Sequence, residues 1–181
     1  PTVLVITPMA IPYLTPVDHS IIISIDSLFS IPDYRMHERI FSLILSLREK
    51  SRKTLSVQTR MDDTTTIERA LEGKLFEFIE DEQKLRKSFS YPPFGTIIKI
   101  TARGEREHVL QGMELIKKLC AEYQPLIPKT ISRDLHRKQN TYRMHAILKL
   151  PQSAYPAHRI ISLLATFKND FDIEVNPEHL L

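Results

Sequence analysis

The hydrophobic positions of the first sixty residues follow two patterns. Residues 2–6 and 20–25 are continuous apolar runs rich in β-branched side chains, which are typical of strands buried on both faces of a parallel sheet. Residues 54–59 predict a third strand. Between residues 33 and 50, apolar side chains recur at helical spacing. We therefore expect this region to form part of a parallel α/β layer.

A long amphipathic helix is predicted next, over about residues 66–89. Thr65 and Glu68 have the spacing of a capping box at its start, and the apolar side chains that follow form one stripe. Pro92 and Pro93 cannot continue a helix, because proline lacks the backbone N–H and restricts the residue before it. The helix must therefore end by about Ser90, and a stiff aromatic connector follows it.

The remaining residues predict strands and helices in a regular alternation. Residues 142–150 alternate strictly between apolar and polar side chains, as in a strand with one buried face. Cys120 lies on the apolar stripe of the helix before it, which favours an inert core thiol. The expected strands are 96–103, 126–132, 142–150 and 171–175, with helices at 107–123 and around 160–167. The order βαββαβ is the ferredoxin-like arrangement.

Composition excludes several classes of protein. The 181 residues are 42% apolar and 26% charged, as in ordinary globular domains, and contain a single cysteine, which excludes an internal disulfide. No apolar run of membrane-spanning length and no signal peptide is present, so we expect a cytoplasmic protein without membrane partners. We also expect a fragment, because the chain begins directly in an apolar run without a methionine.

No catalytic, metal or cofactor site is predicted. The histidines do not occur at metal-ligand spacing with cysteine or carboxylate support, and no Ser/His/Asp or Cys/His nucleophile arrangement stands out. A phosphate-binding loop of the form GxxxxGK[ST] is also missing.

Positive charge gathers near the C-terminal end. Residues 91–181 carry thirteen basic and nine acidic side chains, whereas residues 61–90 carry five and eight. Between residues 125 and 150, Asp134 is the one acidic side chain among six cations. Such a cluster attracts polyanions, although a solvated basic surface is the alternative. The candidate binding residues are these cations and one aromatic: Lys129, Arg133, Arg137, Lys138, Tyr142, Arg143 and Lys149.

Two stretches resemble successive landmarks of the primosomal protein N′ family, the PriA-type replication-restart helicases. The first landmark follows a buried strand in the second helicase lobe, and its matching residues are Pro32, Asp33, Tyr34, Arg35, Glu38, Arg39 and Phe41. The second links that lobe to a small C-terminal domain, and its matching residues are Arg86, Tyr91, Pro92, Pro93 and Phe94. The Tyr-Pro-Pro-Phe element is the more specific of the two.

The resemblance implies three parts. Residues 1–60 would be a partial RecA-like helicase lobe, residues 61–92 a connecting helix and linker, and residues 93–181 a DNA-binding domain. The linker residues would pack between the two domains, with base stacking as the alternative. The basic cluster would bind branched or single-stranded DNA without strong sequence preference. A protein-interaction or structural role is the competing reading, for example binding of the acidic tail of single-strand-binding protein.

Departures from the family concern the parts that couple ATP to movement. Pro12, Tyr13 and Thr15 stand where the family has lysine, glycine and aspartate, and the glycine-free residues 45–53 replace its arginine-finger motif. An arginine finger acts only in a fixed geometry. We therefore expect no ATP hydrolysis or unwinding by this chain alone, although the parent family are ATP-dependent helicases. Whether the chain is part of an active helicase stays open.

Overall fold

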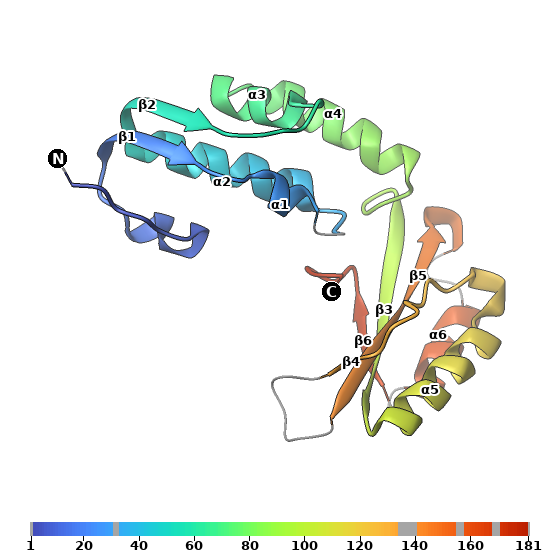
Figure 1. The fold of residues 1–181 in the computed structure, drawn as a ribbon. Coiled ribbons are helices and arrows are strands. Elements are labelled where there is room, and N and C mark those ends of the chain that lie inside the picture. The colour runs from blue at the N-terminus through green and yellow to red at the C-terminus, as the bar shows by residue number, and fades with distance from the viewer. Residues whose placement is uncertain (1, 31–32, 134–140, 155–157, 168–170, 181) are drawn as a thin grey trace. The chain divides into compact units, whose positions relative to one another are not determined.

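The chain forms two compact units (Figure 1). The computed structural model describes residues 2–30, 33–133, 141–154, 158–167 and 171–180. The first unit extends to Lys84 and the second comprises residues Leu85–Leu180, so the division falls within one helix. Each unit has its own cluster of buried apolar side chains, and each is therefore described by itself.

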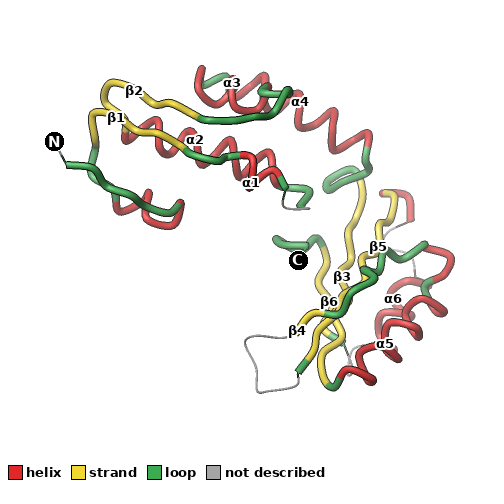
Figure 2. Tube along the Cα trace, in the orientation of Figure 1, coloured by secondary structure: helices red, strands yellow, loops and turns green. Residues whose placement is uncertain are grey.

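The first unit is built on two parallel strands. β1 (Val17–Ile22) pairs with β2 (Ser51–Val57), and α2 (Met36–Lys50) connects them (Figure 2). The strands expected near residues 20–25 and 54–59 and the helix expected over 33–50 are thus present with shifted ends. The other elements are the 3₁₀ helix η1 (Pro8–Tyr13), α1 (Asp26–Phe29), α3 (Thr65–Glu72) and α4 (Leu75–Ser88).

Helix α2 supplies much of the core of the first unit. Its side chains Ile40, Phe41, Ile44 and Leu47 are buried, and their spacing of three to four residues places them on one helical face. Phe41 stacks on Phe78 of α4, with ring centroids 4.0 Å apart and an interplanar angle of 13°. Burial of two aromatic rings at one point fixes α2 against α4.

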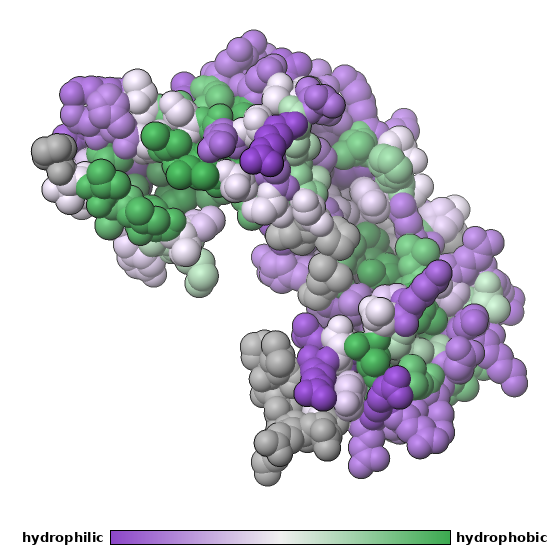
Figure 3. All heavy atoms as spheres, in the orientation of Figure 1, coloured by the Kyte–Doolittle hydropathy of each residue, from purple (hydrophilic) through white to green (hydrophobic). Residues whose placement is uncertain are grey.

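The predicted strand at residues 2–6 is wrong. The structure has no strand there, and Val3 and Val5 are 87% and 91% exposed. A β-branched run becomes a strand only when a neighbouring strand offers hydrogen-bond partners, and β1 pairs with β2 alone among the described residues. Figure 3 shows hydrophobic atoms at the surface over this segment and β1, where Ile21 is also exposed.

The predicted single helix over residues 66–89 is also wrong, because it divides into α3 and α4 at Gly73. Gly73 adopts a left-handed φ of 74°, and the N–H of Lys74 donates to the carbonyl of Arg69 at 2.8 Å. This is the Schellman pattern that ends helices. The predicted capping box is not formed, because the N-cap residue is Thr64, which makes no side-chain hydrogen bond to the helix backbone and instead donates to the Glu68 carboxylate at 2.6 Å.

The second unit is a four-stranded antiparallel sheet with helices. Its spatial strand order is β4-β5-β3-β6, and the expected chain order of strand, helix, strand, strand, helix, strand is present. Its elements are β3 (Gly95–Gly104), α5 (Arg106–Leu119), β4 (Ser132–Arg133), β5 (Tyr142–Pro151), α6 (His158–Phe167) and β6 (Asp172–Val175), with short 3₁₀ helices η2 (Ala121–Tyr123) and η3 (Gln152–Ala154).

One predicted strand of this unit is largely absent. Of residues 126–132, Leu126 forms a single bridge to Ile147 and Ser132 begins β4. Pro128 lies between them and cannot donate a ladder hydrogen bond, which explains why pairing is interrupted. β4 lies at the edge of the sheet, where a proline is tolerated.

Helices α5 and α6 lie on the same face of this sheet (Figure 1). The core between them contains alternate side chains of β3 and β5, including Ile98, Ile100, Ala146 and Leu148, all fully buried. Cys120 belongs to this core, and burial raises the pKa of its thiol to about 11. A thiol with so high a pKa carries almost no reactive thiolate at neutral pH.

The aromatic connector is a tight turn between α4 and β3. Ser90 has a left-handed φ of 48°, and the N–H of Tyr91 donates to the carbonyl of Arg86 at 2.8 Å, which ends α4 in a second Schellman pattern. The Pro92–Pro93 peptide bond is cis, and the N–H of Phe94 donates to the carbonyl of Tyr91 at 2.8 Å. Gly95 then begins β3.

Substitution of Gly95 by alanine should destabilise the second unit. A Cβ at this position would overlap the carbonyl oxygen of Ser90 and lie 2.8 Å from that of Leu150. Both are backbone atoms, so we expect a loss of about 1–3 kcal/mol in unfolding free energy. Hydrogen exchange of the β3 amides during urea titration measures it.

The variant Ser90→Gly is the control for this prediction. It alters the same turn but relieves a left-handed residue, so stability should stay equal or rise by about 1 kcal/mol. Unchanged protection of β3 in Gly95→Ala would show that the turn tolerates a side chain at this position.

Candidate nucleic-acid interface

The face of the second sheet opposite α5 and α6 is rich in cations. The β3–β5 register places Arg103 opposite Arg143, Thr101 opposite His145 and Ile97 opposite Lys149. Directly opposed residues of antiparallel strands project to the same side, and alternation places Lys99 on this side too. We call Lys99, Thr101, Arg103, Arg143, His145 and Lys149 the basic face.

Carboxylates neutralise one half of the basic face. Arg103 forms an ion pair with Asp172 of β6, and Lys99 lies 3.9 Å from Glu174 of the same strand. Lys99 also donates from Nζ to the carbonyl of His179 at 3.0 Å. The β3–β6 side therefore satisfies its cations internally and has little charge left for a ligand.

The β5 half has no such compensation within the described part of the chain. There, neither Arg143 nor Lys149 forms an ion pair with a carboxylate, in contrast to Arg103 and Lys99. Arg143 is exposed, and Lys149 is half-buried. On the basic face, the cations of β3 are thus neutralised by carboxylates of β6, whereas the cations of β5 keep their net positive charge.

His145 lies between the two cations of β5 and is half-buried. Burial lowers its pKa below the usual 6.5, and the charges of Lys99 and Arg143 lower that pKa further. A neutral imidazole at physiological pH follows from both causes. Opposite it, Thr101 is 5% exposed, and its hydroxyl oxygen is buried without a hydrogen-bond partner among the described residues.

The other predicted binding residues lie in different places. Lys129 is exposed and lies outside the strands, whereas Arg133 is exposed and pairs opposite Tyr142, so Arg133 projects to the side away from the basic face. Tyr142 is partly buried against the core. Arg137 and Lys138 lie outside the described residues. Of the seven predicted residues, Arg143 and Lys149 thus lie on the basic face, six residues apart on β5.

Residues of the connector contact one another and β5. Nη1 of Arg86 donates to the carbonyl of Pro92 at 3.1 Å, and Phe94 is half-buried. Tyr91 stacks on Phe89, and the ammonium of Lys149 lies 4.2 Å from the centroid of Tyr91. Their predicted packing between two domains stays a prediction.

Three residues near this site were missed by the sequence interpretation. Lys99 and Arg103 could have been found from the alternation of residues 96–103. Both occupy odd-numbered positions, which point to the side opposite the apolar Ile98, Ile100 and Ala102. Phe89 was assigned to the apolar stripe of a helix. Its place beside Tyr91 depends on the left-handed conformation of Ser90, for which the sequence gives no signal.

Neither a metal-ligand cluster nor a membrane-spanning helix occurs among the described residues. No group of three or more His, Cys, Asp or Glu side chains could hold a metal ion there. No helix in those ranges is long and apolar enough to cross a membrane.

Comparison with known proteins shows which family this chain resembles. No family model matches it. The replication restart protein PriA of Borreliella burgdorferi is 32% identical over 107 residues, which is 56% of this chain and 15% of that protein. The chain is distantly similar to a short region of PriA. The Thermotoga maritima PriA is 26% identical over 164 residues, 88% of this chain and 22% of that protein.

The PriA of Chlamydia muridarum is 28% identical over 154 residues, covering 82% of this chain. The chain spans only 17% of that protein, and less than a quarter of each of the other two. The similarity therefore concerns a limited region of the PriA proteins.

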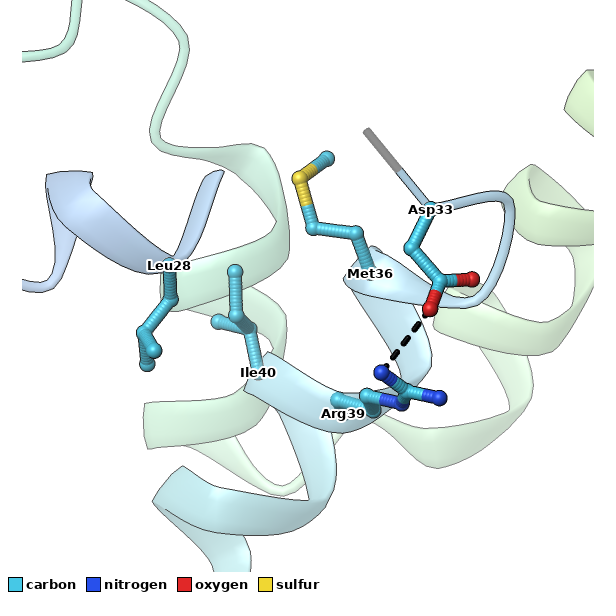
Figure 4. Close-up of a pocket in the computed structure, with 5 residues that line it drawn as sticks. All are labelled: Leu28, Asp33, Met36, Arg39 and Ile40. Carbon is cyan, nitrogen blue, oxygen red and sulfur yellow. Dashed lines mark ion pairs between the residues drawn. The ribbon is translucent and has the colours of Figure 1, made fainter. Parts of the chain in front are cut away.

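The first PriA landmark has a structural role here. Pro32 lies outside the described residues, but Asp33 accepts from Arg39 at 2.8 Å and from the N–H of Arg35 at 3.0 Å. Figure 4 shows Arg39 reaching Asp33 beside a small pocket. That pocket measures about 50 Å³, far below the size of ligand sites. The landmark thus fixes the start of α2.

Removal of the Asp33 carboxylate should destabilise the first unit. Its side chain is 4% exposed, so Asp33→Ala leaves Arg39 and the N–H of Arg35 without their partner. We expect a loss of about 1–3 kcal/mol in unfolding free energy, measured by urea titration.

The matched control is Glu38→Ala. The Glu38–Arg35 pair spans 3.7 Å, with both side chains 41% exposed, and such pairs contribute about 1 kcal/mol or less. Equal losses in the two variants would contradict the structural role given to Asp33.

Proposed function

We propose that the second unit binds DNA, branched or single-stranded, mainly through its phosphates, as part of a PriA-type replication-restart protein in the cytoplasm. The observation that carries this proposal is a pair of cations, Arg143 and Lys149, that have no carboxylate partner among the described residues and lie on the sheet face opposite α5 and α6. A cation that lacks a carboxylate neighbour keeps its attraction for an external anion. The distant similarity to PriA proteins supports DNA as that anion.

Binding of this kind should tolerate any base sequence. The basic face is a pleated sheet with side chains at regular intervals, and it offers no helix of the kind that enters a major groove. Contacts to phosphate fix the position of a protein on DNA but carry no sequence information. The unit would therefore recognise DNA by charge and shape.

An acidic peptide is the other anion that these cations could hold, since arginine and lysine bind carboxylates as well as phosphates. The tail of single-strand-binding protein would be such a ligand. Competition between a short acidic peptide and a forked DNA for the basic face separates the two. Peptide binding without any DNA binding would favour the protein-interaction role.

Neutralising two cations of the basic face should flatten the salt dependence of DNA binding. Each phosphate contact contributes about −0.7 to the slope of log K against log salt on single strands. Replacing Arg143 and Lys149 together by glutamine should therefore reduce the slope by about 1.4. Fluorescence anisotropy with a labelled oligonucleotide between low and moderate salt measures this.

A double substitution on α5 provides the matched control. Lys117 and Lys118 are exposed on the helix that covers the opposite face, so their replacement by glutamine changes net charge equally but should leave the slope unchanged. The proposal would be refuted if the Lys117/Lys118 variant lost as much of the salt slope as the Arg143/Lys149 variant. It would also be refuted if the wild-type protein bound no DNA at low salt.

We further propose that this chain alone does not hydrolyse ATP. Pro12, Tyr13 and Thr15 occupy the positions of the family's lysine, glycine and aspartate, and their side chains cannot take over the roles of those residues. In a coupled phosphate-release assay, with and without DNA, the rate of phosphate release should equal that of buffer without protein. A DNA-stimulated rate above that background, from pure protein, would contradict this expectation.

A further inference from the structure

Three side chains at the beginning of the second unit form a compact aromatic cluster. The rings of Phe89 and Tyr91 stack with centroids 5.7 Å apart and an interplanar angle of 25°. Nζ of Lys149 lies 4.2 Å from the centroid of Tyr91 and 5.8 Å from that of Phe89, within cation–π distance of both. Phe89 is nevertheless 52% exposed.

The backbone holds this cluster in a defined geometry. Ser90, between the two rings, has a left-handed φ of 48°, and the Schellman hydrogen bonds of its neighbours fix the turn. Nη1 of Arg86 donates at 3.1 Å to the carbonyl of Pro92, the residue that follows Tyr91. Lys149 is held by the β3–β5 ladder, opposite Ile97. All three side chains are therefore positioned by hydrogen-bonded backbone.

Comparison with a second stacked pair among the described residues shows what is unusual here. Phe41 and Phe78 also stack, but they are 2% and 7% exposed, as expected for rings that only pack. Phe89 leaves half of its surface in water, where apolar area is unfavourable. Lys149 has no carboxylate partner among the described residues, and burial lowers the pKa of its ammonium. A ligand with a flat apolar surface and a nearby anion would relieve both costs.

We propose that Phe89, Tyr91 and Lys149 bind one unpaired base of single-stranded DNA, with the base stacked on Phe89 and the neighbouring phosphate at the ammonium of Lys149. An aromatic platform beside a cation is the usual means of holding single strands, because every base has a π-face. Bases within a duplex are already stacked, so an unpaired base is required. This inference rests on the proposed phosphate binding of the second unit and names the form of DNA that it prefers.

The substitution Phe89→Leu tests the site. With a single-stranded oligonucleotide that carries the fluorescent base 2-aminopurine, the wild-type protein should quench the fluorescence on binding, because quenching reports stacking. The leucine variant should lose the quenching and bind about fivefold or more weakly. Its salt slope should stay that of the wild type, because no phosphate contact is removed. Phe89→Tyr keeps an aromatic ring, so it should quench the fluorescence and bind as the wild type does. This result would show that the loss in Phe89→Leu comes from the missing ring and not from misfolding.

Phe76→Leu is the matched control, because Phe76 is also an exposed phenylalanine of α4, at 80%, but lies in the first unit. It should leave quenching and affinity unchanged. Salt-dependent binding by the wild-type protein without quenching would overturn the stacking site and leave the phosphate proposal standing. A complete absence of binding at low salt would instead refute the phosphate proposal itself. Equal losses in the Phe76 and Phe89 variants would overturn the assignment to this cluster.

Discussion

The pairing of β3 with β5 is the constraint on which the second unit depends. The two strands pair without interruption over ten residues, from Gly95 opposite Pro151 to Gly104 opposite Tyr142. Because side chains alternate along each strand, this one register places the core residues Ile98, Ile100, Ala146 and Leu148 on the side of α5 and α6, and the cations on the basic face beside Ile97 and Ile147. A slip by one residue would bury Arg143 and Lys149 and expose Leu148. The hydrophobic core therefore determines where positive charge appears.

Gly95 is the point at which this ladder joins the connector. Its backbone lies against the carbonyl oxygens of Ser90 and Leu150, so the turn that ends α4 and the last pair of the ladder share one close contact. The same turn sets Phe89 and Tyr91 beside Lys149. The aromatic residues of the connector are thus explained, within this unit, by a contact to β5.

Strict alternation made β5 predictable from sequence, and the apolar stripe made α2 and α5 predictable. Residues 2–6 have an equally strong local pattern, yet they form no strand, since a strand needs a partner that lies elsewhere in the chain. The break at Gly73 was visible as a glycine, but a glycine alone does not specify a left-handed turn. That Arg143 and Lys149 lie on one side of β5 followed from the alternation of side chains. The neutralisation of Lys99 and Arg103 by carboxylates of β6 depends on strand order, which the local sequence pattern does not encode.

The spacing of the two uncompensated cations limits the ligand that can use both. Arg143 and Lys149 are six residues apart on one strand, so at about 3.3 Å per residue they are separated by roughly 20 Å. A single phosphate or a mononucleotide cannot bridge that distance. Strand β6 lies beyond β3, and there Asp172 and Glu174 neutralise Arg103 and Lys99, so this half of the sheet has little net positive charge to attract a polyanion. A DNA strand that contacts both cations would therefore follow β5 rather than cross the sheet, and it would reach the aromatic cluster at the Lys149 end.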